Sequence, residues 1–130
     1  MKTTIIILSW ICLSAFAQES DTAKPYETAI YKNRMATFKH EGLEKKGIIF
    51  LGNSLTQGGD WSAWFPAQKP ANRGISGDNT EGVLARLDEI TDAKPAKLFL
   101  MIGINDISQN YKNDYLCKNF EKIIRKVLTE

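Results

Sequence analysis

Residues 47–52, with the sequence GIIFLG, form a short continuous apolar run bounded by glycines. This pattern is typical of a strand that is buried on both faces of a parallel sheet. Residues 97–103, with the sequence KLFLMIG, repeat the pattern, and a short extended stretch at residues 71–73 lies between the two runs. Because helical patterns alternate with these strands, the sequence predicts a parallel α/β fold.

Three segments are predicted to be helical. Residues 27–40 show weak helical spacing of apolar side chains. Asp78, three residues before Glu81, is predicted to cap a second helix. The apolar stripe of this second helix comprises Val83, Leu84, Leu87 and Ile90. Residues 115–128 form the third helix, with apolar residues at helical spacing and basic residues pointing away from them.

The composition is that of a globular protein rather than a disordered one. The chain has 130 residues, of which 43% are hydrophobic and 25% are charged. Its formal net charge is +2, and no run of like charges is present. A basic surface for a nucleic acid is therefore not expected, and nucleic-acid partners are excluded.

Residues 1–17 have the pattern of a secretory signal peptide, with Lys2, an apolar stretch and an A-x-A site that ends at Ala17. The apolar stretch is shorter than the roughly 20 residues that a membrane span needs. We therefore expect export to the periplasm or the extracellular space, with no stable membrane span after cleavage. Cys12 falls in the signal, so Cys117 has no intramolecular disulfide partner and is predicted to lie in the core.

Three loops follow the predicted strands and meet at one edge of the sheet, where parallel α/β folds bind their ligands. The first loop contains Ser54, whose hydroxyl and N–H suit nucleophilic chemistry. The second contains Gly77, which lets a substrate approach the backbone. The third contains Asn105, a neutral amide donor that can stabilise an oxyanion. Taken singly, the first loop also fits a helix cap or a phosphate-binding turn, the second a tight turn and the third an Asx-turn.

Taken together, the segments GNSLT at 52–56, ISGD at 75–78 and GIND at 103–106 resemble the first three sequence blocks of the SGNH (GDSL-type) hydrolases. The surrounding sequence is most similar to the branch of platelet-activating-factor acetylhydrolase-like and secreted carbohydrate esterases. The resemblance implies a three-layer parallel-sheet, flavodoxin-like fold. It covers residues 47–130 and implies that they are part of a hydrolase domain whose C-terminal part is missing. The residues before this domain, 18–46, are predicted from their own pattern to be a leader and an N-terminal helix.

The same resemblance assigns roles to three residues. Ser54 corresponds to the nucleophile, and the oxyanion hole corresponds to Ser54, Gly77 and Asn105. The common GDS motif is GNS here, where Asn53 can still form hydrogen bonds as aspartate would. The mechanism requires neither a metal nor a cofactor, and the expected partner is a small-molecule or carbohydrate ester.

The catalytic base of the family is a histidine in a late Asp-x-x-His block. The one histidine here, His40, precedes a strand of five residues that spans roughly 16 Å, so we expect it at the surface near the opposite sheet edge. The chain is therefore expected to be the N-terminal portion of a secreted esterase for short acyl or acetyl groups on carbohydrate. Alone, it is expected to be inactive.

Two other functions fit the same residues. One is a catalytically dead module that holds acyl or sugar ligands in the oxyanion pocket. The other is a flavodoxin-like protein whose Ser54 loop binds phosphate or flavin, although this leaves Asn105 unexplained. Trp61, Trp64 and Phe65 follow the serine loop on one predicted helix face, and we expect them in the core rather than as a carbohydrate platform.

Overall fold

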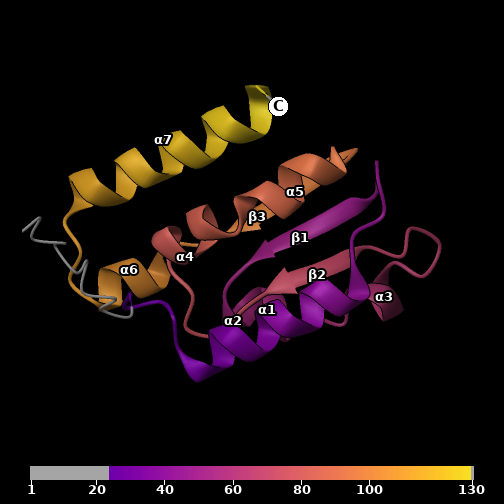
Figure 1. Cartoon of the computed structure of the whole chain (residues 1–130), viewed down its shortest axis with the longest axis horizontal. Coiled ribbons are helices and arrows are strands. Elements are labelled where there is room, and N and C mark those ends of the chain that lie inside the picture. The colour runs from indigo at the N-terminus through magenta and orange to yellow at the C-terminus, as the bar shows by residue number, and fades with distance from the viewer. Residues whose placement is uncertain (1–23, 130) are drawn as a thin grey trace, which may run out of the picture.

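The computed structural model describes residues 24–129, so the predicted signal peptide lies outside the described residues. A parallel three-stranded sheet in the order β2-β1-β3 forms its centre (Figure 1). The strands are β1 (Ile48–Gly52), β2 (Ala71–Gly74) and β3 (Lys97–Met101). The predicted α/β class and its three strands are therefore confirmed, and β1 is the central strand.

Seven helices accompany the sheet in residues 24–129. They are α1 (Ala29–Glu41), α2 (Ser54–Gln57), α3 (Trp61–Trp64), α4 (Thr80–Ala85), α5 (Leu87–Ala93), α6 (Ile104–Ser108) and α7 (Asn113–Thr129). In Figure 1, α7 runs alongside α4 and α5, which it contacts. None of these helices is long and apolar enough to cross a membrane.

One face of the sheet forms the main core. Ile49 and Leu51 are almost completely buried on this face and pack against Val83, Leu87 and Ile90 of α4 and α5. Ile123 of α7 completes the buried cluster, and alternate β3 residues pack against it. Burial of each such side chain contributes about 1.5–3 kcal/mol, so this face accounts for much of the stability of the fold.

The opposite face of the sheet is aromatic and partly exposed. Phe50 is in register with Phe99, and its ring lies 3.9 Å from Trp61 and 4.8 Å from Phe99, measured between centroids. Phe99 is 50% exposed, Trp64 is 60% exposed and Phe65 is 43% exposed. The predictions that β3 is buried on both faces and that Trp64 and Phe65 belong to the core are therefore wrong, because the single turn of α3 is too short to cover the face. Trp61 is half-buried against Phe50.

The predicted cap of the second helix is displaced by one residue. Asn79 caps α4, because its side chain accepts a hydrogen bond from the N–H of Gly82. Asp78 instead accepts from the Asn79 N–H and pairs with Arg86. The predicted single helix is also divided, since the backbone of Arg86 leaves the helical region between α4 and α5.

Cys117 is exposed on α7, so its prediction as a core residue is wrong. The buried residues of α7 include Asn119 and Ile123, which are four residues apart and share a face. Cys117 is two residues before Asn119, a rotation of about 200°, which places it away from the core. His40 is exposed in the last turn of α1, and its prediction as a surface residue is confirmed.

We expect Gly74→Ala to lower the free energy of unfolding by about 1–3 kcal/mol. A Cβ at Gly74 would overlap the backbone of Thr56 and Gln57, so β2 and α2 would have to separate. Gly58→Ala is the control, because the nearest atom to a Cβ there is the Ser54 carbonyl oxygen at 3.4 Å. Urea unfolding followed by circular dichroism measures the free energy of unfolding of both variants. Equal losses of stability in the two variants would contradict the close approach of β2 and α2.

Candidate active site

Ser54 begins α2 directly after β1. The preceding residue, Asn53, is 1% exposed, and its Oδ1 accepts the N–H of Leu55 at 3.0 Å. The Asn53 N–H donates to the carbonyl of Met101 at 3.3 Å, which ties this loop to the end of β3. Ser54 itself is exposed, and in the described chain its N–H donates no hydrogen bond. The loop thus presents a serine and a free backbone donor at the carboxyl edge of the sheet.

The loop after β2 is held against the serine loop by two hydrogen bonds. The N–H of Ile75 donates to the Gly52 carbonyl at 3.0 Å, and the N–H of Ser76 donates to Oε1 of Gln57 at 2.6 Å. Gly77 follows with φ +79°, a left-handed conformation that favours glycine, and open space lies around it. Its N–H also donates no hydrogen bond to any residue in the range 24–129.

Asn105 lies in α6, which starts three residues after β3 ends. Its Nδ2 donates to the carbonyl of Asp78 at 2.7 Å, so the third loop is joined to the second. The next residue, Asp106, is buried and accepts the N–H and the hydroxyl of Thr80. Since an amide nitrogen has two hydrogens, Asn105 keeps one donor for another acceptor. The structure therefore brings all three predicted site residues to one sheet edge.

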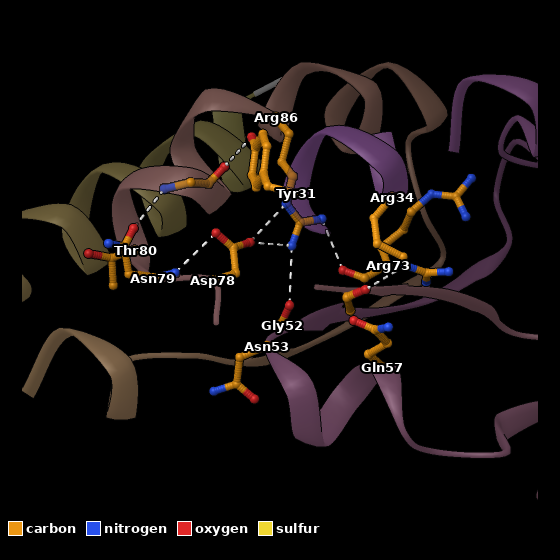
Figure 2. A network of polar contacts seen from close by, with 12 residues as sticks. Tyr31, Arg34, Gly52, Asn53, Gln57, Arg73, Asp78, Asn79, Thr80 and Arg86 are labelled. Carbon is orange, nitrogen blue, oxygen red and sulfur yellow. Dashed lines mark hydrogen bonds and ion pairs between the residues drawn. The ribbon is translucent and has the colours of Figure 1, made fainter. Parts of the chain in front are cut away.

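A buried ion pair between Arg86 and Asp78 lies beneath these loops (Figure 2). Both side chains are 0% exposed. Nε and Nη2 of Arg86 donate to Oδ2 of Asp78 at 3.1 and 2.8 Å. Nη1 donates to the carbonyl of Arg73 at 2.9 Å, and Nη2 donates to the carbonyl of Gly52 at 3.2 Å. One guanidinium thus connects the carboxyl ends of β1 and β2 with the loop that carries Gly77.

Burial determines the ionisation of the groups in this network. Burial raises the pKa of the Asp78 carboxyl, and the Arg86 guanidinium that binds it opposes the shift. Burial also raises the pKa of Tyr31, so its phenol stays neutral and donates to the Gly82 carbonyl at 3.0 Å. These groups support the loops, and neither side chain is exposed to a ligand.

Sequence patterns did not reveal Arg86, Gln57 or Asp106 as parts of the site. Each binds a partner that is distant in the chain, for example Gly52, which is 34 residues before Arg86. The one hint in the sequence is that an acidic residue, Asp78, and a basic residue, Arg86, flank a short helix and could form an ion pair. Within the described part of the chain, no group of three or more metal-ligating side chains gathers.

Comparison with known proteins places this arrangement in a family. The GDSL-like Lipase/Acylhydrolase family matches residues 50–130, a range that contains all three loops. The chain belongs to this family. The predicted resemblance to the SGNH (GDSL-type) hydrolases is therefore confirmed, and ester hydrolysis is the general chemistry of the family.

A solved structure from Streptococcus pneumonia, described provisionally as a platelet activating factor, is similar to this GDSL-like domain. The two are 27% identical with a TM-score of 0.63, and the match covers 75% of this chain and 48% of the other. The chain thus spans about half the length of that structure. No curated protein matches the chain.

We expect Arg86→Met to lower the free energy of unfolding by about 3–5 kcal/mol at pH 7, because it leaves Asp78 as a buried, unpaired charge. Because burial raises the pKa of Asp78, stability falls as pH rises from about 4 through that raised pKa, and above it the native carboxylate is ionised and paired with Arg86. Removal of Arg86 raises the pKa of Asp78 further, so the decrease in stability should extend to higher pH.

Urea unfolding between pH 4 and pH 8 measures both effects. Arg125→Met is the control, because Arg125 pairs with Glu121 on the exposed surface of α7. Arg125→Met should lower the free energy of unfolding by less than about 1 kcal/mol. If the two variants showed the same stability and the same pH dependence, the importance of the buried pair would be refuted.

Proposed function

We propose that this chain carries the nucleophile and the oxyanion hole of a serine esterase. Ser54 is the nucleophile, and the oxyanion hole consists of the N–H groups of Ser54 and Gly77 together with the Asn105 amide. The observation that supports this most directly is the hydrogen bond from Asn105 to the Asp78 carbonyl, next to Gly77. It joins the third loop to a second loop that is already bonded to the serine loop.

The proposed reaction begins when the Ser54 oxygen attacks the acyl carbon of the ester. A base takes the hydroxyl proton, a C–O bond forms, and the carbonyl electron pair moves to the oxygen. That oxyanion accepts hydrogen bonds from the three donors. Collapse expels the alcohol, which takes up a proton, and leaves an acyl-serine that water hydrolyses. The free N–H groups and the spare Asn105 hydrogen suit this role because they are preorganised.

We propose that the base comes from sequence beyond these 130 residues. His40 is the one histidine in the chain and is exposed on α1. The elements β3, α6 and α7 also expose large apolar side chains, which further parts of the fold would cover. They are Phe99, Met101, Ile104, Ile107, Ile124 and Leu128. Loss of the histidine in a serine hydrolase lowers turnover by a factor on the order of 10⁶.

Short acyl or acetyl esters of carbohydrate are the proposed substrates, and we propose that the protein is exported. The exposed ring of Trp64 supports a sugar ligand, since such rings stack on sugars. Trp64 packs edge-on against Trp61, which donates from Nε1 to the Thr56 carbonyl at 2.8 Å and so lies next to the serine loop. The alternative of a dead binding module predicts sugar binding without turnover.

We expect the 130-residue chain to hydrolyse p-nitrophenyl acetate no faster than buffer. The same chain extended with its native downstream sequence should hydrolyse it, and Ser54→Ala should remove this activity. Ser62→Ala is the matched control, because Ser62 is exposed on α3 and bonds only to Asp60. Release of p-nitrophenol measures all four proteins. An extended chain that binds carbohydrate esters without cleaving them would favour the binding module.

We expect Asn105→Ala to lower kcat of the extended chain by about 10²–10³, because one oxyanion donor is lost. KM should change little, since the interaction forms mainly in the transition state. Asn113→Ala is the control, since Asn113 is exposed at the start of α7. A rise in KM with kcat unchanged would instead assign Asn105 to ground-state binding.

A further inference from the structure

We propose that Arg86 is a positioning residue that holds the three oxyanion donors in their common geometry. This proposal rests on the proposed function of Ser54, Gly77 and Asn105. Arg86 is 3% exposed as a whole residue, and its guanidinium reaches Asp78 and Gly52 in the interior (Figure 2), so it acts through other residues and does not touch substrate.

The first part of the argument is the number of segments that one guanidinium joins. Arg86 donates to Gly52 at the end of β1, to Arg73 at the end of β2 and to Asp78 in the second loop. The Gly52 carbonyl also accepts the N–H of Ile75, so Arg86 reinforces the direct bond between the first two loops. Gly52 is two residues before Ser54, and Asp78 directly follows Gly77.

The second part is the connection to the third loop. The Asp78 carboxylate receives two donors from Arg86 on Oδ2 and the Asn79 N–H on Oδ1. The Asp78 carbonyl accepts the Asn105 amide at 2.7 Å. Because three donors hold the carboxylate, the residue cannot rotate freely, and its carbonyl stays aimed at Asn105. The guanidinium therefore constrains Asn105 through a single intervening residue.

The third part is the chemistry of arginine. A guanidinium is planar and presents five donors in a rigid fork, whereas the lysine ammonium is a point charge on a flexible stem. The nitrogen atoms of Arg86 donate to three residues that lie in different directions, which requires the several fixed donors of a guanidinium. Arg86→Lys keeps the positive charge next to Asp78 but is expected to lose the bonds to Gly52 and Arg73. It therefore separates positioning from charge balance.

Arg73 offers a matched control. It is 1% exposed, its Nη1 pairs with Glu41 at 2.9 Å, and its Nη2 donates to the Gly42 carbonyl. Arg73 and Arg86 both lie near the ring of Phe38. The side chain of Arg73 binds the end of α1 and pairs with Glu89 of α5 at 3.5 Å, however, and does not bind the three loops. Arg73→Lys therefore removes a similar buried fork without removing a bond to the site.

The first test measures the reaction of Ser54 in the 130-residue chain with an alkyl fluorophosphonate at alkaline pH, followed by mass spectrometry. Hydroxide takes the serine proton, the Oγ–P bond forms, and the P–F bond breaks with loss of fluoride. The oxyanion donors stabilise the phosphoryl oxygen in this step. We expect Arg86→Lys to slow labelling by about 10²-fold, as a small misplacement of donors does, and Arg73→Lys to slow it little. Equal rates in the two variants would overturn the proposal.

The second test does not depend on the proposed function. Amide hydrogen exchange by NMR compares the wild-type chain, Arg86→Lys and Arg73→Lys. We expect Arg86→Lys to speed exchange in residues 74–78 and at the Asn105 side chain, and Arg73→Lys to speed it at the end of α1. An unchanged pattern at the loops in Arg86→Lys would overturn the positioning role even if Ser54 were never labelled.

Labelling of Ser54→Ala at the wild-type rate would refute the proposed function alone, since the exchange measurement still decides the role of Arg86. If Arg86→Lys does not fold, the double variant Asp78→Asn with Arg86→Gln replaces it. This variant carries no charge at positions 78 and 86 and also lacks the fork, so the same changes in labelling and exchange are expected.

Discussion

The Arg86–Asp78 ion pair is the interaction on which the rest of this site depends. Two fully buried charges are favourable only when each is paired and its remaining hydrogen-bonding groups are satisfied. Here the guanidinium meets that requirement by donating to the carbonyls of Gly52 and Arg73 at the ends of two strands. The same bonds that make the burial of charge tolerable therefore determine where the strand-end loops lie.

Close backbone packing adds a second constraint around this pair. Gly74 of β2 lies against the backbone of Gln57, and Gly52 of β1 lies against the Met101 carbonyl. Neither position has room for a Cβ, so the three strand ends approach one another more closely than side chains would permit. Gly77 differs, because open space surrounds it and its positive φ is the reason for glycine. Glycines in this protein thus serve both packing and the exposure of a backbone donor.

The two faces of the sheet differ in how completely they are covered. Helices α4, α5 and α7 bury Ile49 and Leu51, while the face of Phe50 and Phe99 carries only short elements. The apolar patterns of the sequence predicted β1 and β3 correctly, but they did not predict that the two faces of the sheet are covered to different extents. A continuous apolar run shows that a strand avoids water on both faces, but it does not show which part of the fold supplies the cover. Trp64 and Phe65 were misplaced for the same reason.

The sequence by itself determined the α/β class, the three strands, the family and the positions of Ser54, Gly77 and Asn105, since these follow from local apolar patterns and short motifs. Tertiary structure alone decided that Asn79 caps α4 while Asp78 turns inward to Arg86, and that Gln57 holds the second loop. These choices depend on partners 8 to 34 residues away. Local propensity favours Asp78 and Asn79 alike as a cap, and only the buried guanidinium distinguishes them.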